Sequence, residues 1–324
     1  MAAKILMTGV GSYLPEKVVT NHDLAKWVDT SDEWIVQRTG IEQRHMVAEG
    51  EKTSDLAVAA AHKAMAHAGI DASQLDLIVI ATTTPDDTFP STATTVQRKL
   101  AAANAFAFDV QAVCAGFVYA LTVAESMMLA QKAKKALVIG AESFTKLLDW
   151  EDRGTCVLFG DGAGAVILEA ADTDKDFGIL ASRLHSDGNY RDILYVDGGP
   201  SATGDVGHVR MEGREVFRHA VEKLSSVMDE VIDEAGLVPA DVDWLVPHQA
   251  NLRIINGMQK KLNLPSDRVV RTVHKHANTS AASIPLALSE AVHDGRIKAG
   301  DLLALEAIGG GLAWGASLVR FGRP

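Results

Sequence analysis

The chain contains very little cysteine, because only Cys114 and Cys156 occur among its 324 residues. Two cysteines cannot build a disulfide framework, which excludes a small disulfide-stabilised domain and fits a reducing compartment. Long apolar runs are missing too. No segment reaches the roughly 18 uncharged apolar residues of a membrane span, and the apolar run at the N-terminus is too short for a signal peptide. We therefore expect a cytoplasmic protein with no membrane span.

An excess of positive charge is also missing. Lysine and arginine number 31 against 42 aspartates and glutamates, which gives a net charge of −11. This balance excludes a general nucleic-acid binder, although a local basic patch can still receive one acidic partner. Charged residues make up 23% and hydrophobic residues 47% of the chain, so it is expected to fold around a large core rather than stay disordered.

Short β-branched runs alternate with helical patterns along the chain. The predicted elements are strands at 75–84, 105–110, 135–142 and 242–251, and helices at 54–69 and 213–236. Each of the two helices ends at a glycine that can cap it. Such alternation is typical of an α/β protein with a mostly parallel sheet.

The sequence also repeats itself. The segment "HAGIDASQLDLIVIATTT" (67–84) resembles "EAGLVPADVDWLVPHQAN" (234–251), and Gly69 matches Gly236 at an offset of 236 − 69 = 167 along the chain. Both segments run from a helix end through Ala-Gly and a short loop into a strand. A duplicated unit explains this likeness, and chance similarity is the alternative.

A second pair of segments supports the repeat. It matches the strand-to-helix junction at Cys114 with a junction near Thr279, at an offset of 279 − 114 = 165. We predict two related halves, residues 1–172 and 173–324, with the boundary in the charged segment 171–178. Equivalent junctions of such halves can face one central cleft.

Cys114 lies where a predicted strand meets an apolar helix, in "QAVCAGFVYAL". A helix N-terminus favours an anion, so a cysteine there is expected to have a lowered pKa and more of the nucleophilic thiolate. Free cysteine is also among the most often buried residue types. On these residues alone, a nucleophile and a packing residue stay equally open.

Two other polar residues lie at comparable junctions. His248 ends an apolar strand in "PHQAN", at the sheet edge where α/β proteins place ligands, and is otherwise a core histidine bonded to a carbonyl. Asn278, in "HANTS", precedes a helical stretch and also suits an N-cap. His274 and His276 have no third partner at metal-site spacing, so we expect no metal site.

Two glycine clusters resemble nucleotide-binding loops only superficially. "GDGAGA" (160–165) is followed by a strand pattern, whereas the dinucleotide fingerprint requires a helix there. The run of three glycines at 309–311 also leads into a strand. It forms either a tight hairpin or a place where the backbone approaches a ligand and directs an N–H at it.

Basic residues gather in two patterns. Trp34 and Arg38 lie on one face of a predicted helix, and an indole together with Arg38 and the loop residue Arg153 can hold an adenine and phosphates. On the helix after "PHQAN", Arg253 and the lysines that follow it form a basic face that can receive an acidic carrier; these lysines are Lys260 and Lys261. An ordinary solvated surface is the alternative in both cases.

Taken together, these segments resemble the β-ketoacyl-acyl-carrier-protein synthase III family, the condensing enzymes that initiate bacterial fatty-acid synthesis. The resemblance covers nearly the whole chain and rests on "GVGSYLP", "SDEWIVQRTGI", "AVCAGFVYAL", "DRGTCVLFGDGAGA", "DWLVPHQANLRI", "NTSAAS", "DGRIKAGD" and "GGGLAWGASLVRF". It implies a homodimer with the duplicated thiolase fold, whose five layers follow the order α-β-α-β-α.

The resemblance implies an active site made of Cys114, His248 and Asn278. An acyl-CoA primer would acylate Cys114, with the N–H groups of Cys114 and Gly310 as the oxyanion hole. His248 and Asn278 would then assist the decarboxylation of malonyl-acyl-carrier protein, and the resulting carbanion would attack the acyl group. No metal or other cofactor is implied, because the acyl-CoA is a substrate.

The resemblance also implies binding residues. Trp34 and Arg153 would sandwich the adenine of CoA, Arg38 would lie near its phosphates, Asn251 would contact its pantetheine arm, and Arg253 would help dock the acidic carrier protein.

Two positions are implied to shape the primer pocket. Phe89 would reach across the homodimer and limit the pocket. Members of the family often have phenylalanine where this chain has Ile308, and glycine where it has Ala277. The smaller side chain at position 308 predicts a longer or branched primer as well as acetyl-CoA.

Three alternatives remain at this point. One is a related condensing enzyme of secondary metabolism that uses another primer or malonyl-CoA. Another is a Cys-His-Asn hydrolase, because the spacing of 248 − 114 = 134 between cysteine and histidine fits papain-like enzymes, although "VCAGF" lacks their motif. The last is a CoA-binding module without activity, which would not need the three polar residues.

Overall fold

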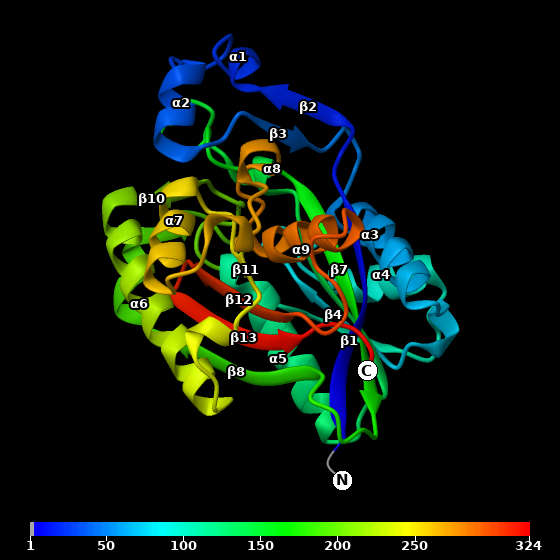
Figure 1. The fold of residues 1–324 in the computed structure, drawn as a ribbon. Helices are drawn as coiled ribbons and strands as arrows, with labels where there is room; N and C mark the ends of the chain where they lie inside the picture. Colours follow the sequence, from blue (N-terminus) through cyan, green and yellow to red (C-terminus); the bar gives the residue numbers. More distant parts are fainter. Residues whose placement is uncertain (1–2) are drawn as a thin grey trace.

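The computed structural model describes residues 3–324, which form two large sheets and two short strand pairs (Figure 1). The five-stranded sheet has the order β1 (Lys4–Tyr13), β7 (Gly162–Ala171), β6 (Lys135–Glu142), β4 (Leu77–Ala81) and β5 (Phe106–Val110). The four-stranded sheet has the order β11 (Trp244–Pro247), β12 (Leu302–Gly309), β13 (Ala313–Arg320) and β8 (Gly178–Ser186). The short pairs are β2 (Lys17–Thr20) with β3 (Gln43–Met46), and β9 (Leu194–Val196) with β10 (Val209–Met211).

Helices cover both sheets and fill the space between them. The outer helices on the five-stranded sheet are α3 (Thr53–Ala68) and α4 (Thr92–Leu100), and those on the four-stranded sheet are α6 (Gly213–Glu234) and α7 (Leu252–Lys261). Between the sheets lie α5 (Gly116–Leu129) and α9 (Ser283–His293), whose apolar side chains join both sheets in one buried cluster. The predicted layer order α-β-α-β-α is confirmed.

The remaining helical segments are short. A lobe at the top of Figure 1 contains α1 (Asn21–Leu24), α2 (Asp32–Thr39) and the β2–β3 pair, with α8 (Val273–His276) below it. The 3₁₀ turns are η1 (Ala72–Gln74), η2 (Val113–Ala115), η3 (Phe144–Leu147), η4 (Gly188–Ile193), η5 (Pro239–Asp241), η6 (Ser266–Arg268) and η7 (Ser280–Ala282).

The predicted elements are confirmed, apart from the direction of several strands. The four predicted strands are β4, β5, β6 and β11, and the two predicted helices are α3 and α6. Both glycine clusters lead into a strand as predicted, although β7 already begins within the first cluster, at Gly162. The expectation of a mostly parallel sheet is wrong. Only β4–β5, β4–β6 and β11–β12 pair in parallel within residues 3–324, because the strands after the glycine clusters, β7 and β13, turn back against β6 and β12.

The two sheets follow the same plan. In each, a parallel pair (β4–β6 or β11–β12) continues into two antiparallel neighbours (β7–β1 or β13–β8). The strand β12 follows β6 at an offset of 302 − 135 = 167, and η7 follows η2 at 280 − 113 = 167. The offset of 167 predicted from the glycines therefore holds for these elements, and the value of 165 was too short by two.

The connection between the two halves runs from the end of β7 at Ala171 to the start of β8 at Gly178. The division at residues 172 and 173 falls there and stays a proposal. No helix within residues 3–324 combines the length and the apolar character needed to cross a membrane.

Candidate active site

Cys114 lies in the tight bend between β5 and the buried helix α5. It is the middle residue of η2, and its side chain is only 5% exposed. The bend forces Val113 to a φ of +49°, which is unfavourable for a β-branched side chain. Backbone strain of this kind persists only where the surrounding structure holds it, and it is common at functional sites.

The expectation that the pKa of Cys114 is lowered is wrong. Burial raises the pKa of its thiol to about 12, and the nearby Glu142 carboxylate raises it further. The Ser280 hydroxyl opposes this rise without offsetting it. Cys114 lies just before α5, which begins at Gly116, so the helix end favours a thiolate there, but burial outweighs it.

His248 follows the last residue of β11 and is buried, with 4% of its surface exposed. Its N–H donates to the Glu306 carbonyl at 2.8 Å, and its Nδ1 lies 2.6 Å from the Ser283 hydroxyl. Ser283 Oγ already accepts a hydrogen bond from the Gln249 N–H, so its own O–H can donate a hydrogen bond to Nδ1. That tautomer leaves Nε2–H as a donor, and burial lowers the pKa of His248 to about 3, which keeps the ring neutral.

Asn278 lies in the segment between α8 and η7 and is 6% exposed. Its N–H donates to the Leu158 carbonyl at 2.9 Å, and its Oδ1 accepts the Ser280 N–H at 2.9 Å. The side chain thus stabilises the start of η7, much as the capping alternative predicts. This bond fixes the carboxamide so that its Nδ2 remains available as a donor.

The fold brings these three residues to one place, although 164 positions separate the first from the last (278 − 114 = 164). The turn η2, with Cys114, packs against η7, which follows Asn278. Ser283, the partner of His248, begins α9 directly after η7. The prediction that equivalent junctions of the two halves meet is therefore confirmed for η2 and η7. That Cys114, His248 and Asn278 act together stays a prediction.

The end of β12 closes in on Cys114 from the other side. A Cβ on Gly309 would lie only 2.5 Å from the Cys114 backbone nitrogen, so only glycine permits this approach. Gly310 follows and starts the turn into β13, which means that the glycine run is both a hairpin and a close backbone approach. This arrangement brings the backbone at the end of β12 against the backbone of Cys114.

The predicted group of Trp34, Arg38 and Arg153 is present, but both arginines contact the Trp34 ring and leave no space between them and the indole. The guanidinium carbon of Arg38 lies 4.4 Å from the centre of the Trp34 ring and that of Arg153 lies 5.4 Å from it. Arg153 also donates to the Asp29 carbonyl at 3.0 Å. An adenine can enter between Trp34 and Arg153 only if the arginine moves away from the ring.

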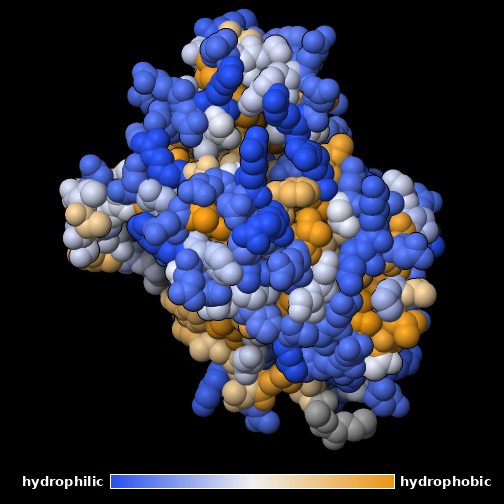
Figure 2. All heavy atoms as spheres, turned by 90° about the vertical axis from the view of Figure 1, so that its left-hand side faces the viewer, coloured by the Kyte–Doolittle hydropathy of each residue, from blue (hydrophilic) through white to orange (hydrophobic). Residues whose placement is uncertain are grey.

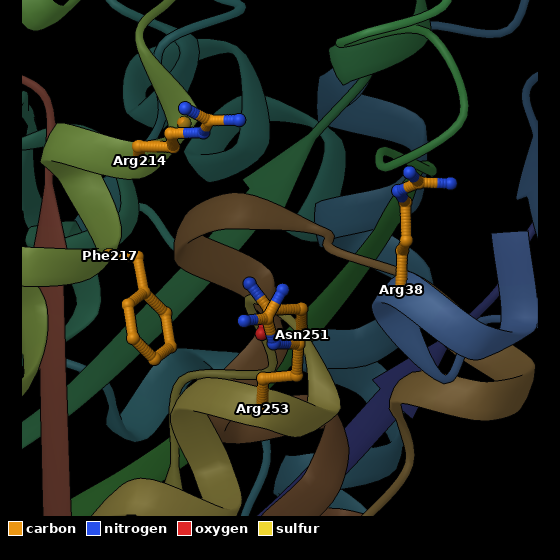
Figure 3. A pocket seen from close by; sticks show the side chains of 6 residues that line it. Arg38, Arg214, Phe217, Asn251 and Arg253 are labelled. Carbon is orange, nitrogen blue, oxygen red and sulfur yellow. The ribbon is translucent and has the colours of Figure 1, made fainter.

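A cavity of about 580 Å³ lies between α2, α6 and the start of α7. Figure 3 shows Arg38 on one side, Arg214 and Phe217 on the other, and Asn251 with Arg253 between them. The residues that line it include three arginines and no acid, which suits phosphates or an acidic partner. Asn251 is the N-cap of α7 and accepts the Ile254 N–H at 3.0 Å.

Of the predicted docking residues, the structure brings only Arg253 to this cavity. Lys260 and Lys261 lie at the far end of α7, about 10 Å along the helix, and Lys261 pairs with Asp229 of α6 at 3.3 Å. The side of the molecule that carries α6 is mostly hydrophilic, with small hydrophobic areas between the polar ones (Figure 2).

A larger cavity of about 940 Å³ reaches the other side of η2. Its walls include Val113, Gly310, Phe144, Leu147, Leu194, Val196 and Val209. Neither predicted pocket residue is among its lining residues. Phe89 is 83% exposed on the adjacent loop, and Ile308 is packed in the core with 6% exposed.

Sequence reasoning missed two residues that line a cavity, Arg214 and Phe217, and two that lie near Cys114, Ser280 and Glu142. Arg214 and Phe217 lie three positions apart on α6, a spacing that places them on one face and that the sequence could have revealed. Ser280 and Glu142 both influence the pKa of Cys114. No local sequence pattern could have paired them, because 138 positions separate them (280 − 142 = 138).

Residues 3–324 contain no group of three or more histidine, cysteine, aspartate or glutamate side chains placed to hold a metal ion. This includes the neighbourhood of His274 and His276, the pair considered in the sequence. The nearest acid to His276 is Glu290, whose carboxylate lies 3.4 Å from Nε2.

Two protein-family models match the chain. Residues 108–188 match "3-Oxoacyl-[acyl-carrier-protein (ACP)] synthase III", and residues 232–321 match "3-Oxoacyl-[acyl-carrier-protein (ACP)] synthase III C terminal". The first range contains Cys114, and the second contains His248 and Asn278.

Similar proteins match over the full length. The β-ketoacyl-[acyl-carrier-protein] synthase III of Rhodospirillum centenum is 60% identical, over 99% of this chain and 100% of its own. That of Erythrobacter litoralis is 62% identical, over 97% and 98%. The crystal structure of 3-oxoacyl-[acyl-carrier-protein] synthase III from Aquifex aeolicus has a TM-score of 0.92 at 48% identity, covering 98% of this chain and 100% of that one. The chain therefore belongs to the β-ketoacyl-acyl-carrier-protein synthase III family of condensing acyltransferases, which have the thiolase fold and initiate fatty-acid synthesis.

Proposed function

We propose that this condensing enzyme uses Cys114, His248 and Asn278 to join an acyl-CoA primer to malonyl-acyl-carrier protein. The primer acylates Cys114, and the malonyl group loses CO₂ and attacks the acyl carbon to give a β-ketoacyl-carrier product. The observation that supports the proposal is the contact of η2, which holds Cys114, with η7, which follows Asn278 and precedes Ser283, the partner of His248. All three proposed catalytic side chains are buried. Neither a resident cofactor nor a metal takes part in these steps.

The first half-reaction needs a nucleophile and a group that stabilises the tetrahedral intermediate. The sulfur of Cys114 attacks the thioester carbon. The resulting oxyanion accepts hydrogen bonds from the N–H groups of Cys114 and Gly310. The close approach of the β12 end to the Cys114 nitrogen supports this oxyanion hole. Because burial raises the pKa of Cys114 to about 12, the thiol must lose its proton as it attacks.

The second half-reaction needs hydrogen-bond donors rather than a strong base. Decarboxylation of the malonyl group develops negative charge on its thioester oxygen. His248, neutral and bonded through Nδ1 to Ser283, offers Nε2–H, and Asn278, bonded through Oδ1 to Ser280, offers Nδ2–H. Two preorganised donors in a buried site stabilise such an oxyanion more strongly than water does.

The acyl-CoA would enter along the basic cavity. Its adenine would stack between Trp34 and Arg153 after Arg153 leaves its present contact with the ring, and Arg38 would hold phosphates. Asn251, whose Nδ2 is not used by its capping bond, would contact the pantetheine arm. The three arginines of the cavity support a ligand that carries several negative charges.

The same surface would receive the carrier protein. Arg253 lines the cavity and is exposed, with its guanidinium carbon 5.3 Å from the centre of the Phe217 ring, so it is accessible to an acidic partner. Lys260 and Lys261 extend the basic face along α7. The ion pair of Lys261 with Asp229 reduces the positive charge that Lys261 offers to a partner. Steering by such charges raises association rates and weakens with salt.

A second copy of the chain would complete the primer pocket. β5 is the edge strand of its sheet and is only partly buried, with Phe106 40% exposed and Phe89 83% exposed nearby. Pairing of two such edges would cover these aromatic rings. Phe89 would then close the larger cavity of the partner. Ile308 would influence the shape of the pocket indirectly, by packing against the residues that line it.

The alternatives considered in the sequence are not favoured. Relatives of about 60% identity along the whole chain are synthases of the initiating class, which argues against a secondary-metabolic enzyme. A hydrolase or an inactive CoA-binding module is inconsistent with membership of this family.

The proposal is tested by separating the two half-reactions. After incubation with acetyl-CoA, intact-protein mass spectrometry should show one acyl adduct on the wild type and none on Cys114→Ala. His248→Ala and Asn278→Ala should keep the adduct but slow malonyl decarboxylation by on the order of 100-fold or more. An adduct on Cys114→Ala, or normal decarboxylation by both other variants, would refute these roles. A panel of acyl-CoA primers then measures the primer preference.

A further inference from the structure

Ser280 lies between Cys114 and a buried acid that the proposed condensation does not use. Its side chain is 0% exposed, and its hydroxyl has no hydrogen-bond partner within residues 3–324. Yet this hydroxyl is close enough to lower the pKa of both the Cys114 thiol and the Glu142 carboxyl. A small rotation of so short a side chain can bring it into a hydrogen bond with either group.

The fold holds Ser280 in this place through the repeat. Ser280 corresponds to Val113 at the offset of 280 − 113 = 167, and both have a φ of +49°. The turn η7 therefore bends as η2 does, and the two bends pack against each other. A Cβ on Gly140 would lie 2.2 Å from the Ala281 carbonyl oxygen, so glycine lets β6 approach η7 and brings Glu142 beside Ser280.

Glu142 is the last residue of β6 and is completely buried. The threonines at the end of β4 bond its carboxylate: Oε2 accepts the Thr83 N–H at 3.0 Å and the Thr84 hydroxyl at 2.9 Å, and Oε1 accepts the Thr83 hydroxyl at 2.9 Å. Thr83 and Thr84 also line the larger cavity, which connects this buried network to the pocket. Burial raises the pKa of Glu142 to about 7.

Cys114 and Glu142 cannot easily carry negative charge together. The carboxylate raises the pKa of the thiol, since two like charges repel each other strongly in a buried place. If the proton of the thiol moves to the carboxylate, one charge replaces the other and the repulsion disappears. Ser280 is the hydroxyl placed to carry that proton, because it can donate and accept at once.

Given the nucleophile assigned under the proposed function, we propose that the Ser280 hydroxyl relays the thiol proton of Cys114 to the Glu142 carboxylate as the acyl-enzyme forms. The S–H bond breaks as Ser280 accepts its proton, and the proton of Ser280 passes to Glu142. The electron pair left on sulfur attacks the thioester carbon, and the carbon–sulfur bond to CoA breaks when the intermediate collapses. The CoA thiolate takes the proton back from Glu142 through Ser280, which restores the starting charges.

His248 is the other candidate acceptor, and it suits the task less. Its Nδ1 is bonded to Ser283, and burial keeps its pKa at about 3, so the ring has little tendency to gain a proton near neutral pH. Glu142, with a pKa of about 7, binds a proton in the range where the enzyme would work. In this arrangement Ser280 is a catalytic residue, and Glu142 acts through it.

Other ionisable groups approach β6 from its neighbours. The elements packed against β6 carry the following ionisable residues: Asp55, His62, Lys63 and His67 of α3 with its N-cap Lys52, Tyr119 and Glu125 of α5, Asp161 and Glu169 of β7 and its preceding turn, and Glu290 and His293 of α9. Cys114 lies in η2, which contacts η7. Asp161, the closest of these along the sheet, is bonded to Thr145 and to the Val47 N–H. Cys114 is the one whose pKa depends on the charge of Glu142.

The test measures single-turnover acylation by acetyl-CoA, without malonyl-carrier protein, by intact-protein mass. Ser280→Ala, Ser280→Gly and Glu142→Gln should acylate on the order of 100-fold more slowly than the wild type. Thr279→Val is the matched control, because it removes a neighbouring buried hydroxyl that also lacks a partner, and its rate should stay within about twofold. Ser280→Gly also suits the positive φ at this position and keeps the test possible if Ser280→Ala is unstable.

The pH profile separates a relay from a merely structural role. The wild-type acylation rate should rise through about pH 7 as Glu142 loses its proton, and Glu142→Gln should lack this step while Glu142→Asp keeps one. If the wild type forms no adduct on Cys114, the proposed function itself fails. If the wild type is acylated and both Ser280 variants acylate at its rate, the relay is wrong and the proposed function stands.

Discussion

Val113 and Ser280 share a φ of +49° at equivalent positions of the two halves, at the offset of 280 − 113 = 167 that relates them. Neither is a glycine, and a positive φ is uncommon for other residues, above all for a β-branched one such as Val113. Each precedes the residue that faces the other half, Cys114 after Val113 and Ala281 after Ser280. The duplicated bend thus places a thiol in one half against a hydroxyl and a small side chain in the other.

Ala277, next to Asn278, has an even less favourable backbone, with φ +58° and ψ −161°, and is completely buried. This region is open almost only to glycine, and the strain costs about 1–3 kcal/mol. Ala277→Gly should therefore raise the free energy of unfolding by ~1 kcal/mol. This net gain already subtracts the entropy cost of folding a chain that glycine makes more flexible when unfolded. Chemical denaturation measures it, and condensation should be retained.

Ala101→Gly is the control for this prediction. Ala101 caps α4 with a φ of +56° in the ordinary left-handed region, where strain is smaller. Its gain should be less than that of Ala277→Gly. A loss of stability in Ala277→Gly would contradict the strain at this position.

Glu306 should make the stability depend on pH. Both of its carboxylate oxygens are buried without a partner within residues 3–324, and burial raises its pKa from 4.5 to about 8. The folded chain therefore holds this proton more tightly than the unfolded chain, so the contribution is complete below about pH 4.5 and is lost as the pH rises through about 8. Glu306→Gln should remove this loss.

The measurement compares the two proteins by urea denaturation from about pH 5 to about pH 9. The wild type should lose stability relative to Glu306→Gln with rising pH, by a few kcal/mol in total. The difference between the two curves isolates Glu306 from the other buried acids and histidines. A difference that does not change with pH would show that Glu306 keeps one protonation state throughout.

Arg153 should contribute to acyl-CoA binding and not to the chemical step. Its guanidinium lies over Trp34, at the base-binding end of the proposed CoA site. Arg153→Ala should raise the KM for acyl-CoA by about tenfold with little change in kcat, as expected for binding remote from the reacting atoms. Initial rates at varied acyl-CoA concentration measure both constants.

Arg268→Ala is the matched control for this variant. Arg268 lies 5.8 Å from the Trp244 ring centre, a comparable stacking contact outside either cavity. Its KM should match that of the wild type. An equal rise in both variants would mean that the change at Arg153 acts through the fold.

Phe106 should contribute to self-association through β5. The strand lies at the edge of the five-stranded sheet, and Phe106 is 40% exposed there. Sedimentation should show the wild type at twice the chain mass, and Phe106→Lys should shift it toward the monomer, because a charge on an edge strand disfavours pairing. Val238→Lys, at an exposed apolar residue on the opposite half, is the control and should remain dimeric. A monomeric wild type would contradict the proposed dimer.

Much of the fold and part of the site could be read from the sequence. The apolar runs placed β4, β5, β6 and β11, and the glycine at the end of α3 marked its cap, because these features depend on neighbouring residues. The pairing of Trp34 with Arg38 followed from helical spacing in the same way. The repeat then indicated that Cys114, His248 and Asn278 would converge.

Other properties depend on residues that are distant in the chain, and they follow from the packing of the fold. The pKa of Cys114 is raised rather than lowered because burial and Glu142 outweigh the nearby helix end, and the sequence around Cys114 contains neither effect. Arg153 meets Trp34, and Ser280 meets Glu142, across more than a hundred positions of chain, so no local pattern could reveal them. Local sequence thus sets which elements and reactive groups exist, whereas the contact between the two halves sets which groups meet and how strongly each holds its proton.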